Sequence, residues 1–316
     1  MRVAGSVTRS MTASPQRTIG LNAALALVGL CAVWGLGQVT IKIGSSGISP
    51  LLQAGLRSTG AAILLFAWCR WQNIRLFEKD GTAWPGVLAG LLFAAEFLLL
   101  YWGLQFTTAA RSVLFLNTSP FFVALGAHLT MAHDRLTPSK IAGLSAAFIG
   151  VLVAFGEGLT MPNWHAVTGD AMTLAAAIAW GATTVLVKAT KLSRIKPERT
   201  LMYQLAVSAV ALLAASASIG EPGFTNVTPL VMAALAYQIV AIAFASYLLW
   251  FWFIAHYPAS QVASFVFLTP VFGVIAGTTL LHEPLSMALL AALVLIAAGI
   301  YIINRPQPVP VGQLPS

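Results

Sequence analysis

Long apolar runs separated by short polar segments make up most of this chain. Reading the runs between charged residues and Gly or Pro breaks predicts ten helices long enough to cross a membrane. A bilayer core about 30 Å thick needs roughly 20 apolar residues per helix at a rise of about 1.5 Å per residue. The predicted spans are residues 19–42, 50–70, 84–106, 109–131, 138–155, 169–190, 200–218, 228–255, 258–281 and 286–304.

Three of these spans begin with a hydroxyl residue followed by proline, at Ser49-Pro50, Thr137-Pro138 and Thr228-Pro229. A hydroxyl side chain can accept a hydrogen bond from a free N–H of the first turn, and proline at the first helical position gives up no helical hydrogen bond. We therefore expect each hydroxyl to cap its helix.

Composition supports a membrane protein and removes other classes. Of 316 residues, 58% are hydrophobic and 8% are charged, whereas soluble domains carry about 25% charged residues. A water-soluble globular protein is therefore excluded. The formal net charge of +8 is spread thinly over the loops, which argues against a phosphate-binding face and a nucleic-acid partner.

Positive charges are distributed unevenly between the two sides of the predicted spans. With a cytoplasmic N-terminus, 14 of the 17 Lys and Arg residues fall on the inner side, Lys42 and Arg111 fall outside, and Arg57 lies within a span. Cytoplasmic loops carry this excess. The prediction is a multi-pass protein of the cell (inner) membrane with an uncleaved first helix and both termini cytoplasmic. For the basic loop at 190–199, binding of anionic lipid or nucleic acid is the alternative to a purely topological role.

The two halves of the chain align with each other. At an offset of 150 residues, Leu98–Trp102 matches Leu248–Trp252 and Pro120 matches Pro270; at an offset of 146, Trp34 matches Trp180. Five helices per copy is an odd number, so the second copy is inverted. The predicted fold class is an all-α polytopic membrane protein with ten transmembrane helices arranged as two inverted five-helix repeats. Such repeats are typical of secondary transporters with a site near the bilayer midplane; a purely structural duplication is the alternative.

Several segments resemble the EamA-type repeat of the drug/metabolite transporter superfamily. The first copy shows the resemblance at 96–107, Arg111, 118–122 and 134–137, and the second copy at 267–272 and 282–286. The resemblance implies a ten-helix transporter of amino acids, other metabolites or toxic compounds, moved mostly outward. Asp134 departs from the family, which commonly has Glu there, and the shorter side chain could weaken an anchoring contact.

On this basis the chain divides into five parts. They are a cytoplasmic tail (1–18), the first EamA repeat (19–155), an outer linker (156–168), the second EamA repeat (169–304) and a second cytoplasmic tail (305–316).

An ionisable side chain within the membrane marks a functional site by default, because its insertion costs roughly 2.5–3.5 kcal/mol. Glu96 lies in the third span between apolar residues, and Arg57 lies at a compatible depth in the second. We predict a buried pair in which Glu96 couples protons or binds a substrate amine and Arg57 is its partner or a carboxylate anchor. The alternative is a static ion pair that only joins the helices.

Polar and aromatic residues at other spans complete the candidate substrate site. Trp34 with Gln38, and Trp180 with Thr184, are spaced four residues apart and so share a helix face. Aromatic residues of this kind also serve as packing or interface anchors. The remaining candidates are Asn117, Ser246, Tyr247 and Gln238. Asn117 precedes Pro120 and could instead satisfy a carbonyl group that the proline leaves free.

The motifs of other function classes are missing from the sequence. Without a His-Glu-x-x-His motif or a cluster of metal ligands, an enzyme with catalytic residues or a metal is not expected. No rings of charge indicate a channel, and no phosphate loop indicates ATP use, so no cofactor is predicted. The partners expected are a small-molecule substrate, the lipid bilayer and protons. A metabolite importer or exchanger is the alternative function; substrate, direction, coupling ion and oligomeric state are left open.

Overall fold

The computed structural model describes residues 19–76, 78–107, 109–132, 134–155, 164–273 and 287–305, and these are helical apart from short connections. In chain order the elements are α1 (Leu21–Gly35), α2 (Gly37–Ser45), α3 (Pro50–Trp71), α4 (Ala83–Gly103), α5 (Ala109–Leu116), α6 (Ser119–Thr130), α7 (Pro138–Phe155), α8 (Trp164–Ala189), the 3₁₀ turn η2 (Lys191–Arg194), α9 (Pro197–Ser218), α10 (Pro229–Tyr237), the π-helix η3 (Gln238–Ser246), α11 (Tyr247–His256), α12 (Ala259–Ser264), the 3₁₀ turn η4 (Phe265–Leu268) and α14 (Met287–Asn304).

The described helices are those of a polytopic membrane protein. Six are long and apolar enough to cross a bilayer, and four shorter apolar helices accompany them at Leu114–Thr130, Pro138–Val153, Ala259–Gly273 and Val294–Asn304. Each predicted span overlaps one of these ten helices. The prediction of an all-α polytopic membrane protein, made from hydropathy, is therefore confirmed for the described helices.

Four predicted spans are less regular than expected. The span at 19–42 turns at Leu36, the span at 109–131 breaks between α5 and α6, the span at 228–255 contains η3, and the span at 258–281 contains η4. The break before α6 has a local cause, since Pro120 lacks an N–H and its ring crowds the carbonyl group four residues earlier. Helix α8 begins at Trp164 rather than 169, so the last part of the predicted linker is helical; the rest of it lies outside the described residues.

Two of the three predicted caps are confirmed. Thr228 accepts a hydrogen bond from Val231 N at 3.2 Å, and Thr137 accepts one from Lys140 N at 3.3 Å. The prediction for Ser49 is wrong: its hydroxyl donates to Gly223 O at 3.0 Å. The first turn of α3 is instead capped by Glu221, whose carboxylate accepts from Leu51 N and Leu52 N at 3.0 and 2.9 Å.

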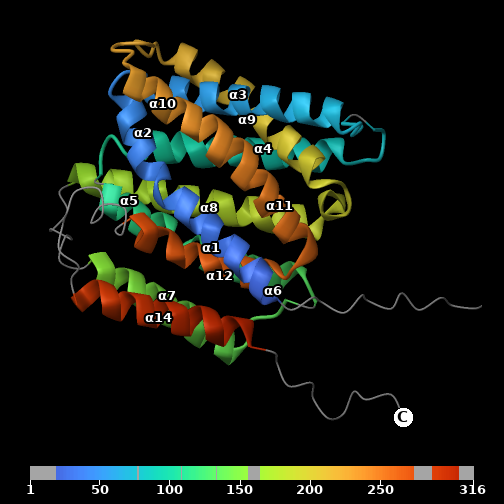
Figure 1. The fold of residues 1–316 in the computed structure, drawn as a ribbon, viewed down its shortest axis with the longest axis vertical. Coiled ribbons are helices and arrows are strands. Elements are labelled where there is room, and N and C mark those ends of the chain that lie inside the picture. The colour runs from blue at the N-terminus through green and yellow to red at the C-terminus, as the bar shows by residue number, and fades with distance from the viewer. Residues whose placement is uncertain are drawn as a thin grey trace, which may run out of the picture.

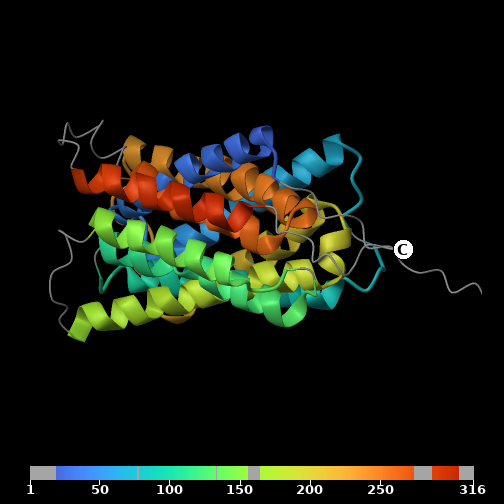
Figure 2. The same cartoon turned by 90° about the horizontal axis from the view of Figure 1, so that it is seen from below.

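The helices lie side by side in one bundle (Figure 1), and the two views show them running along a common direction with the connections gathered at two ends (Figure 2). Helices α7 and α14 pair at one edge of the bundle, and α3 and α9 lie at the opposite edge. The first pair meets backbone to backbone, because a Cβ atom added to Gly143 would lie 2.7 Å from Gly299 O. Close approach at small residues is how helices commonly associate in membranes.

One end of the bundle is held by buried charged groups, and we call it the basic end. Asp134 accepts from Lys140 Nζ at 2.6 Å, from Ser260 N at 3.1 Å and from the Ser260 hydroxyl, so it joins the segment before α7 to the start of α12. The aspartate that departs from the family pattern therefore makes an anchoring contact. Lys188 donates to Ile254 O and Tyr257 O at 2.6 and 2.7 Å, which ties the end of α8 to the end of α11.

The opposite end has its own ion pair. Arg111 on α5 pairs with Asp170 on α8, and Thr107 donates to the same carboxylate at 2.7 Å. Asp134 at the basic end and Asp170 at this end thus each join an element of the first half of the chain to an element of the second.

Candidate functional site

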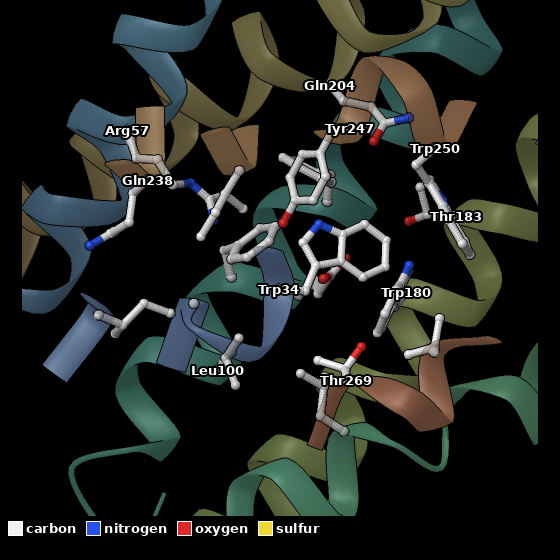
Figure 3. Close-up of a pocket in the computed structure, with 18 of the residues that line it drawn as sticks. Trp34, Arg57, Leu100, Trp180, Thr183, Gln204, Gln238, Tyr247, Trp250 and Thr269 are labelled. Atoms are coloured by element: carbon white, nitrogen blue, oxygen red, sulfur yellow. The ribbon is translucent and has the colours of Figure 1, made fainter. Parts of the chain in front are cut away.

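A cavity lies among side chains from both halves of the chain. Its volume is about 90 Å³, which is room for several water molecules or part of a small organic ligand. Figure 3 shows Arg57 and Gln238 on one side of the view, Trp180 and Trp250 on the other, and Trp34 between them. The polar and charged lining residues are Arg57, Glu96, Asn117, Thr183, Thr184, Gln204, Gln238 and Thr269, and the aromatic ones are Trp34, Phe93, Phe97, Tyr101, Trp180, Tyr247, Trp250 and Phe251.

Arg57 lies eight residues into α3, so it is held well within the bundle. Its side chain is 1% exposed. The guanidinium carbon lies 3.7 Å from the ring centre of Phe97 and about 6 Å from the ring centres of Phe93, Tyr101 and Tyr247. These aromatic faces stabilise the cation, but the Nε and Nη2 atoms of Arg57 have no hydrogen-bond partner.

Glu96 comes from the regular helix α4 and is 6% exposed at the cavity wall. Its Oε2 atom is buried and has no hydrogen-bond partner. In the described part of the chain, no ion pair within 4.0 Å joins Glu96 to Arg57. Both side chains line one cavity, so the predicted depths are compatible. The expected direct pair is not formed, because the Arg57 guanidinium group lies against the Phe97 ring instead.

A cluster of aromatic rings fills the other side of the cavity. The ring centre of Trp34 lies 5.7 Å from that of Trp180, 5.2 Å from Trp250 and 5.9 Å from Tyr247, all edge to face. This geometry is favourable for aromatic pairs. Trp34 is also fixed by its Nε1–H, which donates to Ser246 Oγ at 2.7 Å. Ser246 therefore positions Trp34 rather than lining the cavity itself.

The structure brings most of the predicted site residues together. Trp180 and Thr184 share a face of α8 and both line the cavity, with Thr184 Oγ1 buried and without a hydrogen-bond partner. Asn117 lines the cavity at the break between α5 and α6. Gln38 falls in α2, but its side chain lies outside the described part of the structure.

The π-helix η3 shapes one wall of the cavity. Its first residue, Gln238, is fully buried and accepts hydrogen bonds from the Tyr101 hydroxyl at 2.9 Å and from Gln53 Nε2 at 3.2 Å. Gln238 Nε2 in turn donates to Thr40 O at 2.9 Å. Short π-helical segments are frequently found at functional sites, and this one turns a polar side chain toward α2, α3 and α4.

Sequence reasoning missed Thr183, Gln204 and Thr269 in the wall, and the last two have polar atoms without partners. Both polar atoms of the Gln204 side chain, and Thr269 Oγ1, are buried without hydrogen-bond partners. Gln204 had a usable signal: the prolines that start α3 and α9, Pro50 and Pro197, are 147 residues apart, and the same offset carries Arg57 onto Gln204. Thr269 had none, because a single threonine in an apolar helix is unremarkable.

The unpartnered atoms indicate what the site can do. Leaving a buried polar group without a partner costs about 1–3 kcal/mol, more for a charged one. A cation, a carboxylate, an amide and two hydroxyls that face one cavity can each recover that cost by contacting a ligand. Among the described residues, no group of three His, Cys, Asp or Glu side chains could hold a metal ion.

Comparison with known proteins identifies the family. The model of the EamA-like transporter family matches residues 21–156 and 167–305. A protein of Salmonella typhimurium named a probable amino-acid metabolite efflux pump is 30% identical, over 85% of this chain and 90% of that protein. An uncharacterized transporter of Archaeoglobus fulgidus is 27% identical over 87% of this chain and 94% of its own length. A crystal structure with 16% identity superposes with a TM-score of 0.76 over 90% of this chain and 96% of that one. These matches confirm the resemblance seen in the sequence, and the chain therefore belongs to the EamA-like transporter family of multi-pass membrane proteins.

Proposed function

We propose that this protein is a secondary active transporter that exports amino acids, small metabolites or toxic organic compounds by alternating access, coupled to protons. The observation that carries the proposal is the pair Arg57 and Glu96. Both are buried in mid-helix at one cavity, and both have polar atoms without partners. A static ion pair would satisfy these atoms mutually, so their state favours a site that a solute completes.

Two inverted five-helix repeats are the proposed basis of alternating access. The packing supports this, because the same glycine–phenylalanine contact occurs twice. A Cβ atom added to Gly35 would lie 2.8 Å from Phe272 Cβ, and one added to Gly181 would lie 2.7 Å from Phe122 Cβ. The glycines are 146 residues apart and the phenylalanines 150, which are the offsets of the sequence repeat. Each half thus packs its first helix against the other half in the same way.

Charge distribution and relatives guide the rest of the proposal. The basic end, with Lys140 and Lys188, would face the cytoplasm under the positive-inside rule. The proposed location is the cell (inner) membrane, with both termini in the cytoplasm. The match named an efflux pump in Salmonella typhimurium, and a second of that name in Escherichia coli at 27% identity, support export of amino-acid metabolites.

Glu96 is the proposed proton carrier, because it is the ionisable acid of the cavity wall. A carboxylate that alternately binds a proton and the solute links their movements. The test is proton movement into liposomes that hold the purified protein and a pH-sensitive dye, upon addition of amino acids, metabolites or lipophilic cations. We expect Glu96→Gln to abolish solute-dependent proton movement, and Glu198→Gln, outside the cavity, to retain it. Unchanged proton movement in Glu96→Gln would refute the coupling role.

A further inference from the structure

The charged groups of the cavity all come from one half of the chain. Arg57 and Glu96 belong to α3 and α4, whereas their counterparts at offsets of 147 and 150 residues are Gln204 and Ser246. Both counterparts are neutral. Among the lining residues, the one cation and the one acid therefore both come from the first half of the chain. We call the side of the cavity at Arg57 the charged end and the side at Trp180 and Trp250 the uncharged end (Figure 3).

Arg57 is oriented for a carboxylate. Its guanidinium carbon lies over the Phe97 ring, 3.7 Å from the ring centre, and contact with an aromatic face uses none of the N–H groups as hydrogen-bond donors. Two of the nitrogen atoms at that edge, Nε and Nη2, are buried and unpartnered. Planar guanidinium groups bind carboxylates through two parallel hydrogen bonds, so the position offers one carboxylate a complete binding partner.

The uncharged end is aromatic. Trp34, Trp180 and Trp250 have ring centres within 6.1 Å of one another, and Figure 3 shows Trp180 and Trp250 across the view from Arg57. Such a wall suits the burial of a large apolar group and offers little to a small polar one.

We propose that the solute is a zwitterionic α-amino acid with a large apolar or aromatic side chain; this rests on the proposed transport function. Its carboxylate binds Arg57 Nε and Nη2, its ammonium group binds Glu96 Oε2, and its side chain lies among Trp34, Trp180 and Trp250. Residues of the first half of the chain thus bind the ammonium and carboxylate groups of the amino acid, and the aromatic cluster binds its side chain.

Other charge types fit the cavity less well. A simple organic cation leaves Arg57 unpaired and puts a second positive charge near it. A simple carboxylate leaves Glu96 unpaired and puts a second negative charge near it. An unpaired buried charge is costly. A dicarboxylate would need a second cation, and among the residues that line the described cavity Arg57 is the only Lys or Arg.

Calorimetric binding to the purified protein in detergent tests the proposal with four matched compounds. These are L-phenylalanine, phenethylamine, which lacks the carboxylate, 3-phenylpropionate, which lacks the ammonium group, and L-alanine, which lacks the ring. We expect L-phenylalanine to bind most tightly, and each trimmed compound to bind about tenfold to hundredfold more weakly, since each loses a charged hydrogen bond or the buried ring.

Variants assign each group to its residue. Arg57→Lys is expected to remove the preference for L-phenylalanine over phenethylamine, while Arg70→Lys, on the exposed part of the same helix, retains it. Trp180→Ala is expected to remove the preference over L-alanine, while Trp84→Ala, 76% exposed in the wild type, retains it.

The results separate this inference from the transport proposal. Equal binding of phenethylamine or 3-phenylpropionate overturns the zwitterion assignment, and equal binding of L-alanine overturns the aromatic end. If other solutes drive proton movement in liposomes and none of the four compounds binds, the substrate class is wrong and transport stands. If L-phenylalanine binds as expected but no solute drives proton movement, the binding site stands and proton-coupled transport fails.

Discussion

The two halves of this protein agree in their packing contacts and differ in their polar groups. Gly35 packs on Phe272 as its counterpart Gly181 packs on Phe122, and the matched tryptophans Trp34 and Trp180 touch each other. The helices that hold the site show the opposite. Helix α4 is regular over Ala83–Gly103, whereas the matching segment divides into α10, the π-helix η3 and α11.

The difference reaches the individual side chains. Glu96 Oε2 has no partner, but its counterpart Ser246 donates to Ile242 O at 2.6 Å and accepts from Trp34 Nε1 at 2.7 Å. The serine is satisfied within the protein and the glutamate is not. The comparison teaches that the two halves share contacts that fix helix positions, whereas the charged side chains of the cavity wall come from the first half alone.

The largest expected effect comes from replacing Arg57 and Glu96 by neutral residues, since their counterparts Gln204 and Ser246 are neutral. Replacing buried ionic groups by apolar or neutral ones of similar size often stabilises a protein by about 1–4 kcal/mol. We expect the double variant Arg57→Met with Glu96→Gln to have a free energy of unfolding that is higher than that of the wild type by this amount. We also expect it to lose solute binding. Denaturant unfolding in detergent, with binding calorimetry alongside, measures both.

The control for this variant is Gln204→Met, which removes unpartnered polar atoms without removing a charge. It should change stability by less than the double variant does. A double variant that is less stable than the wild type would mean that Arg57 and Glu96 hold the bundle together, as in the static alternative.

Much of the fold could be predicted from the sequence, because hydropathy and proline positions carry direct physical information. Helix α3 begins at Pro50 and α7 at Pro138, as predicted. Interruptions were harder to foresee. Nothing in the residues 238–246 distinguishes a π-helix from an α-helix, since the choice depends on which side chains the neighbouring helices can accept.

The candidate site shows the same limit. Arg57 and Glu96 could be found because charge within an apolar run is rare, and their depths followed from the rise per residue. Depth does not determine rotation about the helix axis, so the sequence could not show that Arg57 stacks on Phe97 instead of pairing with Glu96. Ser246 was predicted to contact the substrate, because the sequence does not reveal that its hydroxyl accepts a hydrogen bond from Trp34 Nε1.

The shared packing contacts give the next prediction. Alanine at Gly35 or Gly181 places a methyl group within 2.8 Å of phenylalanine Cβ atoms, and overpacking of this kind costs about 1–3 kcal/mol. We expect both variants to lose stability by similar amounts in denaturant unfolding. Gly29→Ala on α1 is the control, because nothing lies within 4 Å of the added carbon. A loss at one glycine alone would show that the two contacts are not equivalent.

The smallest expected effect concerns the loops that follow the equivalent helices α3 and α9. After α9, Glu221 caps the start of α3 through Leu51 N and Leu52 N. After α3, Asp80 pairs with Arg199 near the start of α9 at 2.7 Å. Each loop therefore docks an acid at the start of the other half's helix, once on backbone amides and once on an arginine.

Asp80 makes this second contact dependent on pH. Its carboxylate accepts from the Thr82 hydroxyl at 2.6 Å, and mainly this bond, aided by Thr82 N and Arg199, lowers the pKa of Asp80 from 3.8 to about 2. A depressed pKa stabilises the folded state above the unfolded value and stops doing so as the pH falls through the folded value. Wild type should therefore exceed Asp80→Asn in thermal stability above pH 3.8, and the difference should shrink to nothing as the pH approaches about 2. Melting curves of the two proteins over this range measure it, and a difference that stays constant would mean that the loop is held by its backbone and not by the charge of Asp80.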